Sequence, residues 1–463
     1  MKGNTTKKII YLYLFMCITI IGCFIIFSSI DAINKETITI ITFLINGAII
    51  FLQLCKSSKL GYSLKDIVFL FMFIFMFVSP LIQYIKNDFP WWNTEYFTGE
   101  KIIYANLIIF LFILIYTITY KRSFNKVSRN YENKNNQIKN ISFVIEAFFI
   151  ATLFCSTYII LKTGLNNLFA RSTNLLQIDS SSLSLIVSNT FRAVPIIYIA
   201  MNLLFILKNK YVHRKMKLII GIILGIIVNF PTAVPRFWMA AIYLGILVII
   251  KRKIKNPYLF KIMIFIGILV IFPTINSFRR NTFQEVISYG FSIPKVADAF
   301  ISGDFDSYSM LIRSIIYVDS YGIELGSQLL GNLFFFIPRK IWITKPVGTG
   351  TMIGKSLGWE FSNVSCPYIG EGYINFGILG VLIFAFILAI ITKYCDIYYE
   401  NIANINNNKI RFIEIIYPFS LGFLFFILRG DLLSSLSYYV GFIIPIIIIW
   451  LFQRIAIFKP VIR

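Results

Sequence analysis

Charged side chains are scarce in this chain. Only 14% of its 463 residues are charged, whereas 57% are hydrophobic and the mean hydropathy is +0.76. This composition is typical of a polytopic membrane protein and not of a soluble domain. Acidic residues are the scarcer kind, because 21 of them stand against 44 basic residues and leave a net charge of +23.

Histidine and cysteine are also nearly absent where the chain is polar. His213 is the one histidine, and of six cysteines only Cys366 lies in the long polar stretch 278–366. A disulfide within that stretch is therefore excluded. A zinc site there is excluded as well, because one thiol and no imidazole cannot supply its ligands. We expect neither a metal nor another cofactor.

Apolar runs of about twenty residues, the length needed to cross a bilayer, recur along the chain. We place twelve: 9–30, 37–54, 67–84, 102–120, 141–161, 183–207, 218–231, 234–250, 257–276, 374–392, 412–428 and 436–452. The runs 218–231 and 234–250 are short, so this pair could form a helical hairpin that does not cross completely. The predicted fold is all-α, with about 12 transmembrane helices.

The distribution of Lys and Arg predicts the orientation, because basic residues near a span resist translocation. With both termini in the cytoplasm, the cytoplasmic segments hold 28 of the 44 basic residues but only 6 of the 21 acidic ones. The positive charge therefore belongs mainly to cytoplasmic loops, where it meets anionic lipid headgroups. We expect membrane lipids as partners and no nucleic acid.

One long polar segment separates the ninth and tenth spans on the outer side. It divides the chain into a first membrane domain (1–277), an outer loop (278–373) and a second membrane domain (374–463). Pro294 and the apolar spacing of Tyr308–Val318 predict short helices lying along the membrane surface. Eight basic residues nevertheless occur between Arg279 and Lys355, although the outer face should be depleted of them. This excess indicates an anionic partner.

Further cations lie at outer or mid-membrane depth. A charge there costs roughly 2.5 to 3.5 kcal/mol on insertion scales unless it faces a polar cavity or a partner. We expect Arg192 and Arg236 to face a cavity. Arg429 either does the same or forms an ion pair with Asp431.

The string Gly348–Ser356 superficially matches a phosphate-binding loop. Neither Gly348 nor Gly350 stands four residues before Gly354, however, and no strand precedes the string. We therefore do not predict a nucleotide site here.

Two stretches of the outer segment resemble a known family. Ile337–Pro346 with the two following glycines, and then Ile369–Gly380, are similar to the signature block of Wzy-type polymerases of O-antigen and capsule repeat units. Arg429-Gly430-Asp431, before the last span, is also similar to that family. The resemblance covers the architecture of the whole chain, but its motifs lie only between about Arg279 and Gly380 and at Arg429.

The resemblance implies a metal-independent glycosyltransferase with a GT-C-like helical fold in the bacterial cytoplasmic (inner) membrane. Such enzymes use oligosaccharides linked to undecaprenyl diphosphate. They move the growing glycan onto the non-reducing end of the next lipid-linked repeat unit, for lipopolysaccharide or capsule. A chain-length regulator and a flippase of the same pathway are the protein partners that it implies.

The residues fit such a reaction. A sugar that leaves a diphosphate needs little acid catalysis but needs cations that hold the developing charge, and arginine pairs with phosphate through two nitrogens. We predict Arg236, Arg280 and Arg339 as diphosphate ligands and Glu371 as the general base, with Asp431 in reserve. The further substrate-binding candidates are Arg279, Arg313, Lys340, Lys345, Arg429, Asp431 and Arg192.

A flippase of lipid-linked oligosaccharides is the alternative function. It would also have about twelve spans and a cationic cavity. Flippases and secondary transporters usually have short connections and two similar halves. One long outer insertion and the absence of visible internal symmetry favour the polymerase.

Overall fold

The computed structural model describes residues 37–271 and 299–457, apart from gaps at 57, 123–136, 165–167, 170–181, 213, 255, 362 and 404–407. Within these residues every regular element is a helix, and the one β-feature is an isolated bridge between Gln137 and Arg411. Eight of the helices are long and apolar enough to cross a membrane. The prediction of an all-α, polytopic membrane protein is therefore confirmed at this level.

Each predicted span within the described residues overlaps a helix, and the last part of the span 257–276, residues 272–276, lies outside them. The helices are α2 (Thr37–Leu54), α3 (Leu64–Phe73) with η1 (Ile74–Val78) and α4 (Ser79–Lys86), α5 (Gly99–Lys121), α6 (Ile141–Thr163), α7 (Ser182–Asn209), α8 (Lys215–Val228), α9 (Arg236–Lys251), α10 (Pro257–Ile266) with η7 (Gly267–Ile271), α17 (Tyr368–Ala403), α18 (Phe412–Arg429) and α19 (Leu432–Ile457). The span predicted at 9–30 lies outside the described residues. Because α8 has 14 residues, α9 has 16 and α10 has 10, the count of twelve spans stays a prediction.

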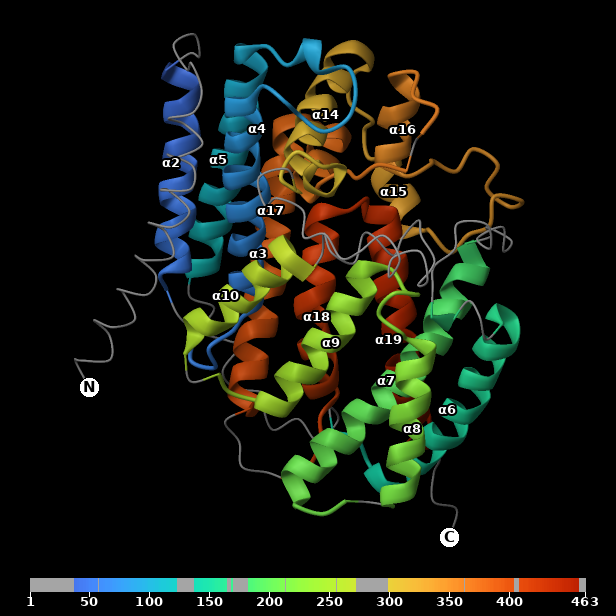
Figure 1. Cartoon of the computed structure of the whole chain (residues 1–463). Coiled ribbons are helices and arrows are strands. Elements are labelled where there is room, and N and C mark those ends of the chain that lie inside the picture. Colours follow the sequence, from blue (N-terminus) through green and yellow to red (C-terminus); the bar gives the residue numbers. More distant parts are fainter. Residues whose placement is uncertain are drawn as a thin grey trace, which may run out of the picture.

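Connections predicted to share a side of the membrane meet at the same end of the bundle. At one end the Tyr62 hydroxyl donates to the carbonyl of Arg252 (2.6 Å), and Glu414 accepts hydrogen bonds from Lys208 (2.7 Å) and Arg252 (3.1 Å). The other end carries η2 (Thr94–Tyr96), η9 (Gly303–Phe305), α14 (Ser307–Tyr321), α15 (Ser327–Leu333) and α16 (Thr349–Ser356) (Figure 1). We call it the α14–α16 end. Which end faces the cytoplasm stays a prediction.

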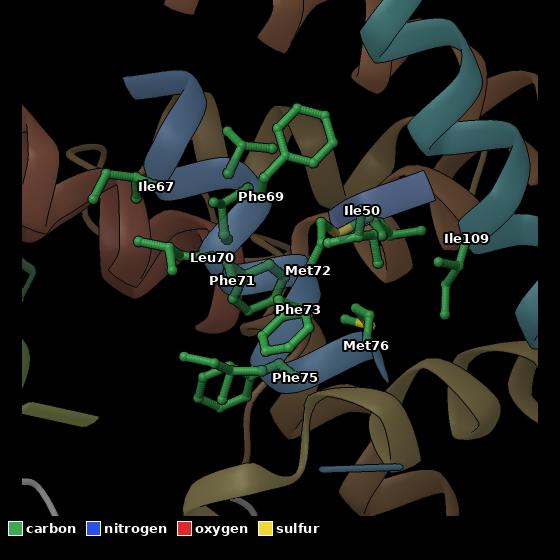
Figure 2. Packing of buried hydrophobic residues seen from close by; sticks show 14 of the residues in the cluster. Ile50, Ile67, Phe69, Leu70, Phe71, Met72, Phe73, Phe75, Met76 and Ile109 are labelled. Atoms are coloured by element: carbon green, nitrogen blue, oxygen red, sulfur yellow. The ribbon is translucent and has the colours of Figure 1, made fainter. Parts of the chain in front are cut away.

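The helix α3 with η1 and α4 forms the centre of the first half of the bundle. Its sequence is apolar on every side, as is typical of a helix surrounded by others. Figure 2 shows Phe69, Phe71, Phe73 and Phe75 on this helix, with Ile50 of α2 and Ile109 of α5 beside it. All six side chains are almost fully buried.

The buried apolar side chains form two large clusters that meet on α18. The first cluster joins α2, α3, α5, α10, α14 and α17, and it includes Tyr417 and Leu421 of α18. The second joins α6, α7, α9 and α19, and it includes Phe419 and Phe423 of α18. Successive faces of α18 therefore pack against different groups of helices. This shared helix ends at Arg429, at the α14–α16 end.

The helix α14 falls in the segment that was predicted to lie along the membrane surface. Residues Ser307–Ile315 are buried, and α14 packs against α5 and α17. The hydroxyl of Tyr308 donates to the carbonyl of Ile102 (3.2 Å) and to the side-chain oxygen of Asn106 (3.0 Å). The apolar residues of this helix cover more than one face, and other helices enclose them. Its position relative to the membrane surface stays a prediction.

The helix α17 contains a sharp fold-back that the sequence did not reveal. Phe376 and Gly377 leave helical geometry, and Gly377 has φ +61° and ψ −144°, a conformation open mainly to glycine. The rings of Tyr368 and Phe384 lie 5.0 Å apart, whereas sixteen residues of straight helix would span about 24 Å. Tyr368–Asn375 is therefore a short helix that folds back against the long one and carries Glu371.

Candidate functional site

Two arginines converge on the loop that precedes α14. The helices α9 and α18 pack together, and Arg236 begins α9 where Arg429 ends α18. Arg236 donates two hydrogen bonds of 2.7 Å, one to each carboxylate oxygen of Asp304. Arg429 forms an ion pair of 3.1 Å with Asp306 and donates to the backbone carbonyls of Gly303 (3.0 Å) and Asp304 (3.1 Å). We call the side chains of Arg236, Arg429, Asp304 and Asp306 the arginine cluster.

The arginine cluster is only partly open to solvent. The side chains of Arg236 and Asp304 are 14% and 13% exposed. The rings of Phe237 and Phe426 stack at 4.4 Å, and the guanidinium of Arg429 lies 5.3 Å from the Phe237 ring, where the π face favours a cation. The two-nitrogen geometry of Arg236 on a carboxylate is also the geometry with which arginine binds phosphate.

Two expectations about these arginines differ from the structure. The expected alternative of an Arg429–Asp431 ion pair is not observed, because Arg429 points to Asp306 while Asp431 accepts hydrogen bonds at the start of α19. Arg236 was expected to face a cavity, yet it meets the carboxylate of Asp304. Both arginines therefore already have anionic partners within the protein.

Glu371, the predicted general base, is fully buried. Its two oxygens accept hydrogen bonds from the Thr349 hydroxyl (2.7 Å), the Asn332 amide (3.3 Å) and the backbone N–H of Leu432 (3.0 Å). A general base must reach the proton that it removes. In this arrangement no substrate hydroxyl can reach the carboxylate, because the side chain is fully buried. The role itself stays a prediction.

Asp431, the reserve candidate, is also buried. It accepts hydrogen bonds from the backbone N–H groups of Gly350 (3.0 Å), Leu433 (3.0 Å) and Ser434 (3.4 Å). Burial raises the pKa of Asp431 above the ordinary range of a carboxyl, although these hydrogen bonds act in the opposite direction. Asp431 and Glu371 thus face the same short stretch, Thr349–Gly350, from two helices.

Arg339, Lys340 and Lys345 lie on the loop between α15 and α16. Arg339 donates to the carbonyls of Lys345 and Pro346 (3.0 Å to Pro346), and its side chain is exposed. Lys345 is buried and donates to the carbonyls of Phe335 (2.5 Å) and Ile337 (2.9 Å). Burial, followed by the nearby charge of Arg339, lowers the pKa of Lys345. The exposed Lys340 and Arg339 are the cations of this loop that an external ligand could reach.

Arg313 has a packing role. Its guanidinium is buried, donates to the carbonyls of Pro90 and Trp92, and lies 4.8 Å from the Phe97 ring and 5.0 Å from the Trp359 ring. Burial lowers the pKa of Arg313 to about 10. It joins the 87–98 connection to the outer segment. The negative charge of Asp306, a member of the arginine cluster, acts on Arg313 in the opposite direction to burial.

Arg192 contacts the last residue of α8. It donates to the carbonyl of Val228, while Asn229 donates to the carbonyl of Arg192 (3.1 Å). A basic side chain on the free carbonyls of a helix C-terminus is a common stabilising contact. Arg192 therefore holds α7 to the end of α8, and the cavity expected around it is replaced by this backbone contact.

Two of the predicted ligands, Arg279 and Arg280, lie outside the described residues. Among the described residues, no group of three or more His, Cys, Asp or Glu side chains could hold a metal ion. A cavity of about 210 Å³ lies at the opposite end of the bundle, between the 56–66 segment, Tyr120 and α17. It is therefore separate from the predicted site.

The sequence interpretation missed the partners of these charges. Asp304 and Asp306 bind the arginines, and Asn332 and Thr349 bind Glu371. The one available signal was the position of Asp306, because an acidic residue directly before an apolar helical run often marks the start of a helix. Its arginine partner lies more than a hundred positions away, and spacing along the chain does not reveal it.

No protein-family model, curated protein or solved structure matches this chain. The functional interpretation therefore depends on the residues themselves and on the resemblance of the short motifs.

Proposed function

We propose that this protein is a polymerase of lipid-linked oligosaccharide repeat units, working at the α14–α16 end on the outer side of a bacterial cytoplasmic membrane. It would transfer the growing glycan from undecaprenyl diphosphate to the non-reducing end of the next lipid-linked unit. In this proposal the bundle crosses the membrane in a GT-C-like arrangement, with both termini in the cytoplasm.

The observation that carries the proposal is the convergence of Arg236 and Arg429 at one end of the bundle, where the exposed Arg339 also lies. Guanidinium groups at the tips of two apolar helices are costly unless they have anionic partners. Asp304 and Asp306 supply such partners here. A diphosphate presents the same paired oxygens as a carboxylate, so it suits the same guanidinium forks.

The chemistry needs these cations more than it needs an acid. The bond between the anomeric carbon and the phosphate oxygen breaks, and the diphosphate keeps the electron pair. The acceptor hydroxyl forms the new bond to the same carbon and gives up its proton. Fixed positive charge at the diphosphate stabilises the charge that develops as it leaves.

The proton of the acceptor hydroxyl must pass to a base. Glu371 and Asp431 are both buried beneath the Thr349–Gly350 stretch and would have to exchange hydrogen bonds before either could accept a proton. The proposal therefore depends on the arginines, and Glu371 as base stays a prediction.

The experiment is reconstitution of the purified protein with lipid-linked repeat units, followed by sizing of the product. Wild type should give a ladder of lengthened glycans. Arg339→Ala and Arg280→Ala should each lose the long products without a loss of protein, and Arg339→Lys should be impaired because it cannot pair through two nitrogens. Wild-type chain length in either alanine variant would remove that residue from the site.

Arg236 is tested with a conservative substitution, because alanine would remove both hydrogen bonds that Asp304 accepts from it. Arg236→Lys keeps the charge but loses the fork and should shorten the products. Lys101→Ala, which removes an outer cation paired with Asp319, is the matched control and should give the wild-type ladder. Repeat units that cross the vesicle membrane but stay single would indicate a flippase instead.

A further inference from the structure

Glu371 and Asp431 are two buried carboxylates, and no cationic partner of either is found in the part of the chain that the structure describes. The exposed fractions of the two residues are 0% and 8%, and neither forms an ion pair with any described residue. A buried carboxylate is costly unless opposite charge or several hydrogen-bond donors compensate it. The groups that donate to this pair are mainly backbone N–H groups, which points to another source of compensation.

The compensation comes from the N-termini of two helices. Asp431 accepts from Gly350 in the first turn of α16 and from Leu433 and Ser434 in the first turn of α19. Glu371 accepts from the side-chain hydroxyl of Thr349, which begins α16, and from the backbone N–H of Leu432, which begins α19. The free N–H groups at a helix N-terminus carry partial positive charge and favour an anion. The two acids therefore cap α16 and α19 together, and we call this arrangement the double cap.

The fit at the start of α16 is close. A Cβ on Gly348 would lie 2.5 Å from a carboxylate oxygen of Asp431, and a Cβ on Gly350 would lie 2.2 Å from the carbonyl oxygen of Val364. No larger residue fits at either position without displacement. The Gly348–Ser356 string does present a helix N-terminus to an anion, and the anion is the protein's own carboxylate.

The double cap is connected to Arg339 by a short chain of contacts. Arg339 donates to the carbonyls of Lys345 and Pro346, which precede Thr349 by four and three positions. Lys345 in turn donates to Phe335 and Ile337 just after α15, and Asn332 of α15 donates to Glu371. Both ends of the loop that carries Arg339 are thus fixed at the same acid pair.

We infer that Glu371 and Asp431 are positioning residues, which dock α16 on α17 and α19 and thereby hold the Arg339 loop in place. The inference rests on the proposed function for the role that Arg339 plays toward substrate. The docking itself does not depend on it. In this inference Glu371 acts through Thr349, Asn332 and Leu432, which is an alternative to its predicted role as general base.

The variants remove single contacts of the double cap. Thr349→Val keeps the shape of the side chain but removes the hydroxyl that donates to Glu371, whereas Thr349→Ser keeps the hydroxyl. Asp431→Asn removes one acceptor oxygen. Ser356→Ala is the matched control, because this hydroxyl on the same helix donates to Ile353 of α16 itself.

Cys366 is a natural probe for the docking. Its thiol is fully buried in the same apolar cluster as Ile353 of α16. Burial raises the pKa of the Cys366 thiol, and the charges of Glu371 and Asp431 raise it further, so the docked protein should be alkylated slowly. Cys155 of α6 is buried in the second cluster and reports on unfolding of the whole protein. Peptide mapping after maleimide treatment would give both rates.

Thr349→Val and Asp431→Asn each remove one buried hydrogen bond of the double cap. The loss of such a bond should make local opening around Cys366 more frequent and raise its alkylation rate about tenfold. The rate at Cys155 should not change, and Thr349→Ser and Ser356→Ala should behave as wild type. An unchanged rate at Cys366, or a parallel rise at both cysteines, would overturn the inference.

Activity provides the second readout. If docking positions Arg339 for substrate, Thr349→Val should raise KM for the lipid-linked unit more than it lowers kcat, and Thr349→Ser should restore both. A lower kcat at unchanged KM would indicate a merely structural role and contradict the positioning of Arg339. Should wild type make no polymer, the proposed function fails, while the alkylation rates still decide the docking.

Discussion

Arg429 is paired with Asp306, 123 positions away in the sequence, and not with Asp431, which stands two positions after it. The reason lies in Gly430. Its N–H donates to the carbonyl of Phe426 and ends α18, and Asp431, the next residue, accepts a hydrogen bond from the first turn of α19. Arg429 and Asp431 therefore point into different contacts, one toward the arginine cluster and the other toward α16.

The Arg429–Asp306 pair gives a prediction about stability. Asp306→Ala leaves Arg429 unpaired and also removes the acceptor of Trp91 (3.0 Å) and Ser365 (2.7 Å). We expect a loss of about 3 kcal/mol in the free energy of unfolding, the scale for breaking a largely buried pair from one side. Thermal melting in detergent would measure it, with the exposed Asp88→Ala as control. A loss equal to that of the control would contradict the importance of the pair.

Arg236 and Asp304 should be coupled energetically. A double-mutant cycle with Arg236→Ala, Asp304→Ala and the double variant should give a coupling energy of about 1 to 3 kcal/mol, because both hydrogen bonds of the pair are lost together. Unfolding of each variant in detergent supplies the four stabilities. Additive losses would mean that the pair contributes nothing beyond its separate contacts.

The fold-back in α17 makes Gly380 sensitive to substitution. A Cβ there would lie 1.8 Å from the carbonyl oxygen of Gly372, so Gly380→Ala should force the two segments apart. We expect a loss of at least about 2 kcal/mol and a lower yield of folded protein. Gly267→Ala, with nothing within 4 Å of the new methyl group, is the control. Equal yields of the two variants would argue against the fold-back.

Asp431 should make stability depend on pH. Its folded pKa is raised by burial, so the folded state keeps a proton that the unfolded chain loses above about pH 4. Its contribution to stability is fully present below that pH and falls as pH rises through the raised pKa. The difference in melting temperature between wild type and Asp431→Asn should therefore shrink or reverse with rising pH. A difference that grows with pH would contradict the sign.

Much of the fold could be predicted from the sequence because lipid imposes a simple rule. A helix must be apolar over about twenty residues to cross, and the described predicted spans from 37–54 to 436–452 do overlap helices. The burial of α14 and the fold-back at Gly377 could not be predicted. Both depend on which helices surround a segment, and the period of its own apolar residues does not contain that information.

For the candidate site, the sequence identified charged residues but not their contacts. It singled out Arg236 and Arg429 because charges are rare at such depths, and Glu371 and Asp431 as candidate bases. Their partners, such as Asp304 and Thr349, lie far away in the sequence, in segments without a distinctive pattern. Only the folded structure shows that these residues are in contact. The place of Glu371 before an apolar run is visible in the sequence, but the helices that bury it are not.

The Arg236–Asp304 ion pair of the arginine cluster crosses the boundary between the two apolar clusters of the bundle. Asp304 and Asp306 flank Phe305, a member of the first cluster, whereas α9, which carries Arg236, packs mainly in the second. An anion that displaced Asp304 from Arg236 would therefore also remove a link between the halves. Binding of such an anion to the arginines would then be thermodynamically linked to the relative tilt of the helices in the first and second apolar clusters. A change in either one would alter the other.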